Sequence, residues 1–275
     1  MRQNKLKNII KKCTGTLMSL ILCMNLMSPV IAFAQTDNGS AIHLKTQEDL
    51  EELAENCRLD TWSQGKTIML DNDLVLNDKA DEFLPIPIFG GTFEGNGHTI
   101  SGLSLDGENS RIGLFDTVQA GGAIKNLSVV GQVSSGGDGD TVGGLAGINY
   151  GKLISCSFDG TVQGKVSVGG LVGINESTGQ MVNCRFQGSV TGEHYVGGIA
   201  GQNTGSLVRC ENYGEINTTA VEVSVDISDI SMLRTTESVP AGTDIGGIAG
   251  FSSGVIQNCE NQGSVGYEHM GYNVG

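Results

Sequence analysis

The sequence predicts an all-β protein, a right-handed parallel β-helix (solenoid) of about six to seven coils with an N-terminal capping helix. The first observation behind this prediction is the stretch V-G-G-L-A-G at Val142–Gly147. It returns at offsets of 26, 28 and 49 residues, as Val168–Gly173, Val196–Gly201 and Ile245–Gly250. A fixed period of this size is typical of repeat architectures, in which stacked copies share one core.

A second marker keeps a matching spacing. Four cysteines follow one another at offsets of 28, 26 and 49 residues: Cys156, Cys184, Cys210 and Cys259. An earlier copy, Ile124–Val133, carries Leu127 at the cysteine position. A position that accepts either Leu or Cys indicates a packed apolar site. We therefore expect a ladder of buried free thiols rather than disulfides or metal ligands.

The pieces within each copy are short, apolar and separated by Gly, Asn and Ser, which favours strands and turns over helices. About 26 residues fit one coil of three short strands, stacked at the roughly 4.8 Å strand spacing. Asn149, Asn175 and Asn203 each lie two residues after the glycine motif, and Ser252 takes this place in the fourth copy. Because Asn tolerates the left-handed backbone that a corner needs, we expect an Asn ladder at one bend.

The repeated V-G-G-L-x-G, with its following x-N-x-G, apolar-x-N-C turn and G-x-V strand, resembles the GLUG repeat. That repeat occurs in bacterial extracellular proteins, including the immunoglobulin A1 metallopeptidases. The stretches at Gly91–Leu103 (G-T-F-E-G-N-G-H-T-I-S-G-L) and Gly113–Phe115 (G-L-F) resemble the first coil of such arrays. The resemblance covers the chain from about Gly91 onward. It implies a repeat scaffold in a secreted or surface protein and implies no activity.

Residues 1–34 have the pattern of a signal peptide. A basic front with five Lys and Arg residues precedes the apolar stretch Leu17–Met27, and Pro29 precedes the small-residue site Ala32-Phe33-Ala34. We expect cleavage after Ala34 and a secreted or cell-surface location. A retained membrane anchor is the alternative, for which the apolar run is short.

Without residues 1–34 the chain has 11 Lys and Arg against 30 Asp and Glu, a net charge of −19. This charge disfavours nucleic acid and anionic membranes as partners, and we expect no stable membrane span after cleavage. In the simplest interpretation, this negative charge keeps the secreted protein soluble. Calcium binding at Asp138 and Asp140 is the alternative, although two aspartates fall short of the six to eight oxygens that calcium takes.

Residues 35–64 are predicted to form an N-terminal cap. Ile42 and Leu44 alternate as in a short strand, and Thr46 is placed to cap a helix that reaches Cys57. An apolar face on this helix would cover the first coil, because an open coil invites edge-to-edge association. The alternative is a helix that binds a partner protein.

Residues 65–275 are predicted to form the β-helix. Lys66–Leu70 and Leu74–Leu76 are the expected first strands, and Asn77–Phe89 is an expected loop and edge because Pro85 and Pro87 cannot donate to a ladder. Asn96-Gly97 indicates a tight turn.

Between Cys210 and Cys259 the chain holds an insertion at 217–243, in which Val221–Ile227 alternates as in a half-buried strand. Such an insertion is either a binding loop or a tolerated outgrowth. Val274-Gly275 matches the first two residues of another glycine motif, so we expect the array to continue beyond 275 in a longer protein.

The sequence indicates no catalytic, cofactor-binding or metal-binding residues, and no cofactor is expected. His43, His98, His194 and His269 are scattered and form no H-E-x-x-H, so the metallopeptidase activity of some GLUG proteins does not carry over. A catalytic pair of acids would have to share one repeat position so that the two side chains line up. Asp159, Glu176 and Glu211 do not share one. Arg185 and Arg209 flank two of the cysteines and are interpreted as surface residues.

The predicted function is a non-catalytic repeat scaffold, stalk or adhesive module, secreted or displayed at a bacterial surface. The expected partner is an extracellular protein or glycan, together with end-to-end self-association. The alternative is a carbohydrate-active β-helix enzyme, a polysaccharide lyase or hydrolase, which would require acids and a base converging on one face.

Overall fold

The computed structural model describes residues 41–76, 84–107, 110–136, 141–217 and 243–266, and the backbone of 272–274. These residues belong to one compact unit, Gly39–Gly275. The predicted signal peptide, the Asp138 and Asp140 pair and most of the predicted insertion lie outside them. Within the described part of the chain, no helix is long and apolar enough to cross a membrane.

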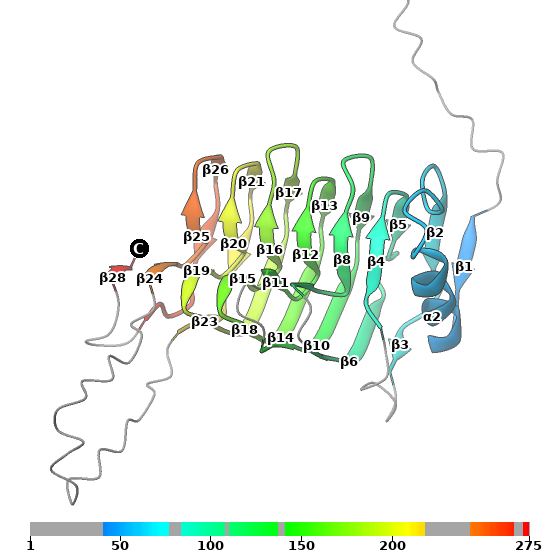
Figure 1. Ribbon diagram of the computed structural model, residues 1–275, viewed down its shortest axis with the longest axis horizontal. Coiled ribbons are helices and arrows are strands. Elements are labelled where there is room, and N and C mark those ends of the chain that lie inside the picture. Colours follow the sequence, from blue (N-terminus) through cyan, green and yellow to red (C-terminus); the bar gives the residue numbers. More distant parts are fainter. Residues whose placement is uncertain are drawn as a thin grey trace, which may run out of the picture. The chain divides into compact units, whose positions relative to one another are not determined.

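The unit begins with the predicted cap. Strand β1 (Ile42–Leu44) leads into helix α2 (Gln47–Asn56), the one helix among the described residues. Thr46 caps the helix: its hydroxyl accepts from the Asp49 backbone N–H at 3.2 Å, and the Asp49 carboxylate accepts from the Thr46 N–H at 3.0 Å. The apolar face packs into the common core through Leu50, Leu53, Ala54 and Cys57. The predicted helix is confirmed, and it lies at the N-terminal end of the stack (Figure 1).

Four parallel sheets run along the stack, and we name them A to D. Sheet A holds, in spatial order, β1, β2 (Thr67–Leu70), β5 (Thr92–Glu94), β9 (Ala123–Lys125), β13 (Lys152–Ile154), β17 (Gln180–Val182), β21 (Ser206–Val208) and β26 (Val255–Gln257). Sheet B holds β3 (Leu74–Val75), β6 (Thr99–Gly107), β10 (Ser128–Ser135), β14 (Ser157–Gln163), β18 (Arg185–Thr191), β22 (Glu211–Asn212) and β27 (Glu260–Asn261), with β23 (Glu215–Ile216) also paired to β18.

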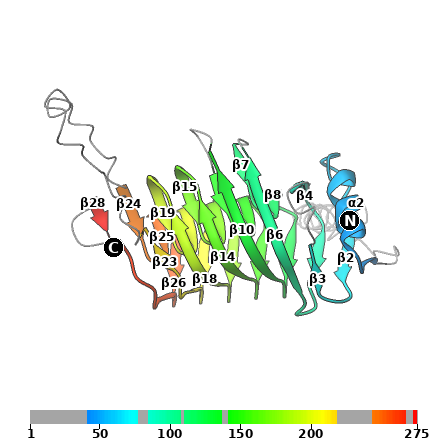
Figure 2. The same cartoon turned by 90° about the horizontal axis from the view of Figure 1, so that it is seen from below.

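The other two sheets are shorter. Sheet C holds β4 (Ile86–Phe89), β8 (Phe115–Val118), β12 (Ala146–Asn149), β16 (Val172–Asn175), β20 (Ala200–Asn203) and β25 (Ala249–Ser252). Sheet D holds β7 (Arg111–Ile112), β11 (Thr141–Gly143), β15 (Val166–Gly169), β19 (His194–Gly197), β24 (Thr243–Gly246) and β28 (Tyr272–Val274). The chain visits the sheets in the order D, C, A, B and then starts the next coil, and consecutive strands of sheet B lie side by side in Figure 2. The predicted parallel β-helix is therefore confirmed, with about six coils.

The prediction of three strands per coil was wrong, because each regular coil has four. The glycine motif is divided at its paired glycines: β11 ends at Gly143 and β12 begins at Ala146. A Cβ on Gly144 would lie 2.4 Å from the Phe158 ring, so the corner requires glycine. The two halves of one motif therefore belong to two sheets, D and C.

Side chains of equal repeat position stack into ladders inside the coils. In sheet A the register joins one inward position through successive coils. Its side chains are fully buried: Ile68, Phe93, Ile124, Leu153, Met181 and Leu207. Because each coil covers its neighbour, one hydrophobic core extends along the unit.

The predicted Asn ladder is confirmed, but the backbone reason for it was wrong. The Asn149 amide donates to Asn175 Oδ1 at 2.8 Å, Asn175 donates to Asn203 Oδ1 at 2.8 Å, and Asn203 donates to Ser252 Oγ at 3.0 Å. None of these residues has a positive φ. Two of the buried amides also bond the chain locally: Asn149 Oδ1 accepts from the Gly151 N–H at 3.0 Å, and Asn175 Nδ2 donates to the Gly179 carbonyl at 3.3 Å.

Left-handed backbone occurs instead at the corner between sheets A and B, one residue before the cysteine position. The φ values there lie between 51° and 54°, at Asn126, Ser155, Asn183, Arg209 and Asn258. We call this the A–B corner. It is occupied by Asn in three of the five coils, which agrees with the tolerance of Asn for this conformation.

The first strands also follow the sequence. Of the predicted loop and edge at Asn77–Phe89, the last four residues form β4, which is the edge strand of sheet C and tolerates Pro87 there. Asn96 and Gly97 have φ of 54° and 80° and form the predicted turn. That turn connects β5 of sheet A to β6 of sheet B and does not form a hairpin.

The C-terminal end shows the start of another coil. Strand β28 pairs with β24, and Val274 lies in register with Ile245. The match between Val274 and the first residue of the glycine motif is therefore confirmed.

Candidate functional site

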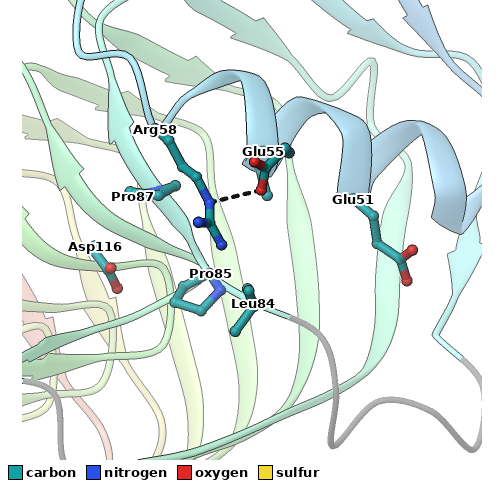
Figure 3. A pocket seen from close by; sticks show the side chains of 8 residues that line it. Glu51, Glu55, Arg58, Leu84, Pro85, Pro87 and Asp116 are labelled. Atoms are coloured by element: carbon teal, nitrogen blue, oxygen red, sulfur yellow. Dashed lines mark ion pairs between the residues drawn. The ribbon is translucent and has the colours of Figure 1, made fainter.

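A pocket of about 430 Å³ opens between the cap helix and the first strands of sheet C (Figure 3). We call it the cap pocket. Helix α2 contributes Glu51, Ala54 and Glu55, and Arg58 follows its C-terminal end. The facing side is formed by Leu84, Pro85, Pro87 and Asp116. Arg58 Nε lies 2.7 Å from Glu55 Oε2, in a pair whose side chains are 58% and 69% exposed. Such an exposed pair contributes little stability.

Asp116 is the unusual group of the cap pocket. Its Oδ1 is buried and has no hydrogen-bond partner among the described residues. Burial raises the pKa of the Asp116 carboxyl to about 7, and the Arg111 guanidinium opposes this only in part. A buried oxygen without a donor is costly, so the atom is a place where a ligand with an N–H or O–H group would gain a hydrogen bond.

The register of sheet C shows that Asp116 occupies a glycine position of the repeat. Phe115 pairs with Ala146 and Thr117 with Ile148, so Asp116 has the register of Gly147. Every later coil has glycine at this place: Gly147, Gly173, Gly201 and Gly250. A Cβ on Gly173 would lie 2.7 Å from the backbone nitrogen of Val142, in the sheet D strand of the preceding coil.

Asp116 escapes this restriction because of its place in the stack. In the described part of the chain, sheet D begins with β7, so it has no strand one coil earlier that would face Asp116. Sequence reasoning missed this residue. The available signal was G-L-F-D at Gly113–Asp116, which departs from the repeat where V-G-G-L-A-G has its last glycine.

The predicted thiol ladder is confirmed over three coils. Cys156, Cys184 and Cys210 are free and buried, and Leu127 is buried at the equivalent position. Neighbouring thiols on both sides and burial raise the pKa of Cys184. Cys259 is free but only partly buried, since it lies on the last regular coil. Cys57 is buried below the helix, and burial raises its pKa to about 11.

The acids singled out in the sequence do not meet. Asp159 lies in register with Gln187, whereas Glu211 lies in register with Arg185 and Glu260. Glu176 directly follows the Asn ladder at Asn175.

The histidines are equally separate. His43 and His98 contact Asp71 and Asp73 at 2.7 and 3.2 Å, and His194 contacts Thr243. His269 lies outside the described residues.

The two arginines do come together. Arg185 and Arg209 line a groove of about 430 Å³ at the A–B corner, with Ser155, Cys156, Ser157, Asn183, Cys184 and Glu211. Arg185 Nη2 donates to Glu211 Oε2 at 2.9 Å, and Arg209 Nε donates to Asn183 Oδ1 at 2.7 Å. Their surface position agrees with the sequence interpretation, but their shared groove was not predicted.

Comparison with known proteins supports the repeat assignment. Residues 164–191 match the family model "The GLUG motif", so the predicted GLUG repeat is confirmed there. A stretch of 96 residues, 34% of the chain, is 41% identical to halomucin of Haloquadratum walsbyi (strain DSM 16790 / HBSQ001). The chain spans about 1% of the length of that curated relative.

A solved structure shares the fold. It is a crystal structure of a Bacteroides ovatus protein named after the immunoglobulin A1 proteases, with a TM-score of 0.54 and 14% identity. The match covers 86% of this chain and 85% of that chain. At this identity the likeness concerns the fold alone.

Proposed function

We propose that this GLUG-repeat chain is a non-catalytic scaffold, a stalk or adhesive module that is secreted or displayed at the cell surface. The observation that carries the proposal is the continuous stack of in-register coils. Its core ladders run through the regular coils and its Asn ladder through three of them, whereas outward residues change from coil to coil. Such a fold holds a varied outer surface on a rigid frame, as repeat proteins that bind ligands do.

Export is part of this proposal. The basic front, the apolar stretch and the Ala32-Phe33-Ala34 site support secretion, with cleavage after Ala34. The local similarity to halomucin points in the same direction. The partners we propose are an extracellular protein or a glycan, and the net negative charge argues against nucleic acid.

End-to-end self-association is supported by the last regular coil. Ile256 continues the sheet A core ladder beyond Leu207, yet 43% of it is exposed, and the neighbouring Val255 is 56% exposed. Unpaired strand edges with apolar side chains favour pairing with another chain.

One observation favours the alternative, a carbohydrate-active enzyme. The Asp116 carboxyl has a pKa raised to about 7 inside a pocket, which is a property of general acids. A glycosidase would need a second carboxyl at a defined separation from it. The other carboxylates of the cap pocket, Glu51 and Glu55, are exposed, and Glu55 is paired with Arg58. Asp159, Glu176 and Glu211 lie on later coils and do not line the pocket.

The test is a binding panel run beside a turnover assay. The chain, purified after export, is applied to immobilised glycans and extracellular-matrix proteins, and the same preparation is incubated with polysaccharides. We expect saturable binding to a panel member and no release of reducing ends or unsaturated products. Turnover that disappears in Asp116→Asn would overturn the proposal in favour of the enzyme.

A further inference from the structure

The groove at the A–B corner holds two cations in an acidic chain. Arg185 and Arg209 are the only Lys or Arg residues between 166 and 233, and they come from adjacent coils. The rest of the groove wall is hydroxyl, amide and thiol groups together with Glu211. We call this the arginine groove. Two arginines gathered at one place, in a chain with a formal net charge of −14, indicate a local preference for an anion.

Arg209 occupies a backbone position that does not suit it. Its φ is 52°, at a corner where the other coils carry Asn126, Ser155, Asn183 and Asn258. The left-handed conformation is more costly for Arg than for Asn, which has a short polar side chain. The corner has this conformation in every regular coil, so the fold explains the backbone of Arg209 but not the presence of Arg there, which points to a role for its side chain.

One nitrogen of the Arg209 side chain makes a hydrogen bond, and its other donors are available to a ligand. Its Nε donates to Asn183 Oδ1 at 2.7 Å, which fixes the guanidinium plane above the corner. Among the described residues, the two terminal nitrogens of Arg209 have no hydrogen-bond partner. A planar fork with free donors matches a carboxylate, which it binds through two parallel hydrogen bonds.

Arg185 forms the second side of the groove. Its guanidinium donates to Glu211 Oε2 from Nη2 and Nε, at 2.9 and 3.3 Å, and lies 5.0 Å from the Tyr213 ring centre. Tyr213 Oη donates to the same Glu211 oxygen at 3.1 Å. Glu211 and the adjacent Glu260 offset part of the positive charge. Arg185 therefore forms a fixed side of the groove, and Arg209 is the residue that is available to bind an anion.

We propose that the arginine groove binds a sugar that carries a carboxylate, such as a uronic acid unit of an acidic glycan. The Arg209 fork would receive the carboxylate, and the hydroxyls of Ser155 and Ser157, with the Asn183 amide, line the groove where sugar hydroxyls would lie. The hydroxyl and amide groups of this lining suit a sugar better than the apolar side chains of a peptide. This inference rests on the proposed adhesive function and names the ligand class for it.

The experiment measures binding of a linear oligogalacturonate by calorimetry, with its methyl ester as the neutral analogue of equal shape. The chain is compared with Arg209→Asn, Arg209→Lys and the control Lys152→Gln. Asn is the residue of the neighbouring corners, so Arg209→Asn should fold with an unchanged or higher unfolding midpoint. Lys152 lies in register with Gln180, so its replacement removes one charge elsewhere at a position that already accepts Gln.

We expect the free acid to bind at least tenfold more tightly than its ester. Arg209→Asn should weaken binding of the acid by about tenfold to a hundredfold, the range for a hydrogen bond to a charged group. Arg209→Lys should lose most of this as well, because Lys lacks the fork, and Lys152→Gln should stay within about twofold.

Other results would overturn the inference in separate ways. If Arg209→Asn binds the acid as the parent chain does, the groove is not the site. Tighter binding of a poly-glutamate peptide that is lost in Arg209→Asn would replace the sugar by an acidic protein. Binding of only neutral glycans or matrix proteins would remove the inference and keep the adhesive function, whereas binding of no panel member would remove both.

Discussion

The middle coils and the last regular coil carry the same motifs, but they differ in what is buried. Leu207 and Cys210 are fully buried in the fourth regular coil. Their partners one coil later, Ile256 and Cys259, are 43% exposed and partly buried. The opposite end is closed by helix α2, which packs Leu50 and Leu53 into the core. Burial of a repeat position is therefore supplied by the next coil or by a cap, and not by the motif itself.

The largest expected effect is a difference between these two coils in the stability lost on truncating one position of the sheet A core ladder. Leu207→Ala removes a buried side chain between Met181 and Ile256 and should lower the free energy of unfolding by about 2–5 kcal/mol. Ile256→Ala removes a side chain that is 43% exposed, and should cost less than about 1 kcal/mol. Urea unfolding followed by circular dichroism measures both. Equal losses would show that the last coil is covered in solution, for example by a second copy.

The next effect concerns the first coils, where Asp116 replaces the glycine of later coils. Its pKa is raised from 3.8 to about 7, so the folded state favours the neutral carboxyl. Stability from this group is fully present below about pH 4 and falls as the pH rises to about 7. The loss is on the order of 4 kcal/mol for a shift of this size.

Asp116→Asn removes the ionisation and should flatten this pH dependence. The variant should be more stable than the parent chain at pH 8 by about 1–3 kcal/mol and similar to it at pH 4. Thermal or urea unfolding at both pH values provides the measurement. Glu55→Gln is the control, because it removes an exposed carboxylate of the same pocket and should change stability by less than about 0.5 kcal/mol. A parent chain whose stability is constant between pH 4 and 8 would contradict the burial of Asp116.

The smallest expected effect is a difference in thiol reactivity between the middle coils and the last regular coil, with no change in stability. Cys184 should react with a thiol reagent only after denaturation, because it is buried between the thiols of neighbouring coils. Cys259 should react faster in the folded chain, since it is only partly buried. Mass spectrometry of the modified peptides, with and without denaturant, distinguishes them. A disulfide between any two of Cys156, Cys184, Cys210 and Cys259 would refute the free-thiol ladder.

The sequence was enough to predict the repeat period, the parallel β-helix, the capped helix at Thr46, the Asn ladder and the thiol ladder. These features are local or periodic: Asn149, Asn175 and Asn203 stack because equal offsets along the chain place them at equal positions in successive coils. The period likewise placed Cys156, Cys184 and Cys210 in one column.

Features that depend on contacts between coils and sheets became visible in the three-dimensional structure alone. The glycine motif is split between two sheets because Gly144 meets the Phe158 ring, a contact that no spacing along the chain reveals. The left-handed corner lies at Asn183 and Arg209 instead of the Asn ladder, because that is where sheets A and B meet. Asp116 fits at a glycine position because its coil has no earlier sheet D strand among the described residues, and its Oδ1 is buried without a partner. In each case a residue's environment is set by atoms of another sheet or another coil, whose contact the sequence pattern does not specify.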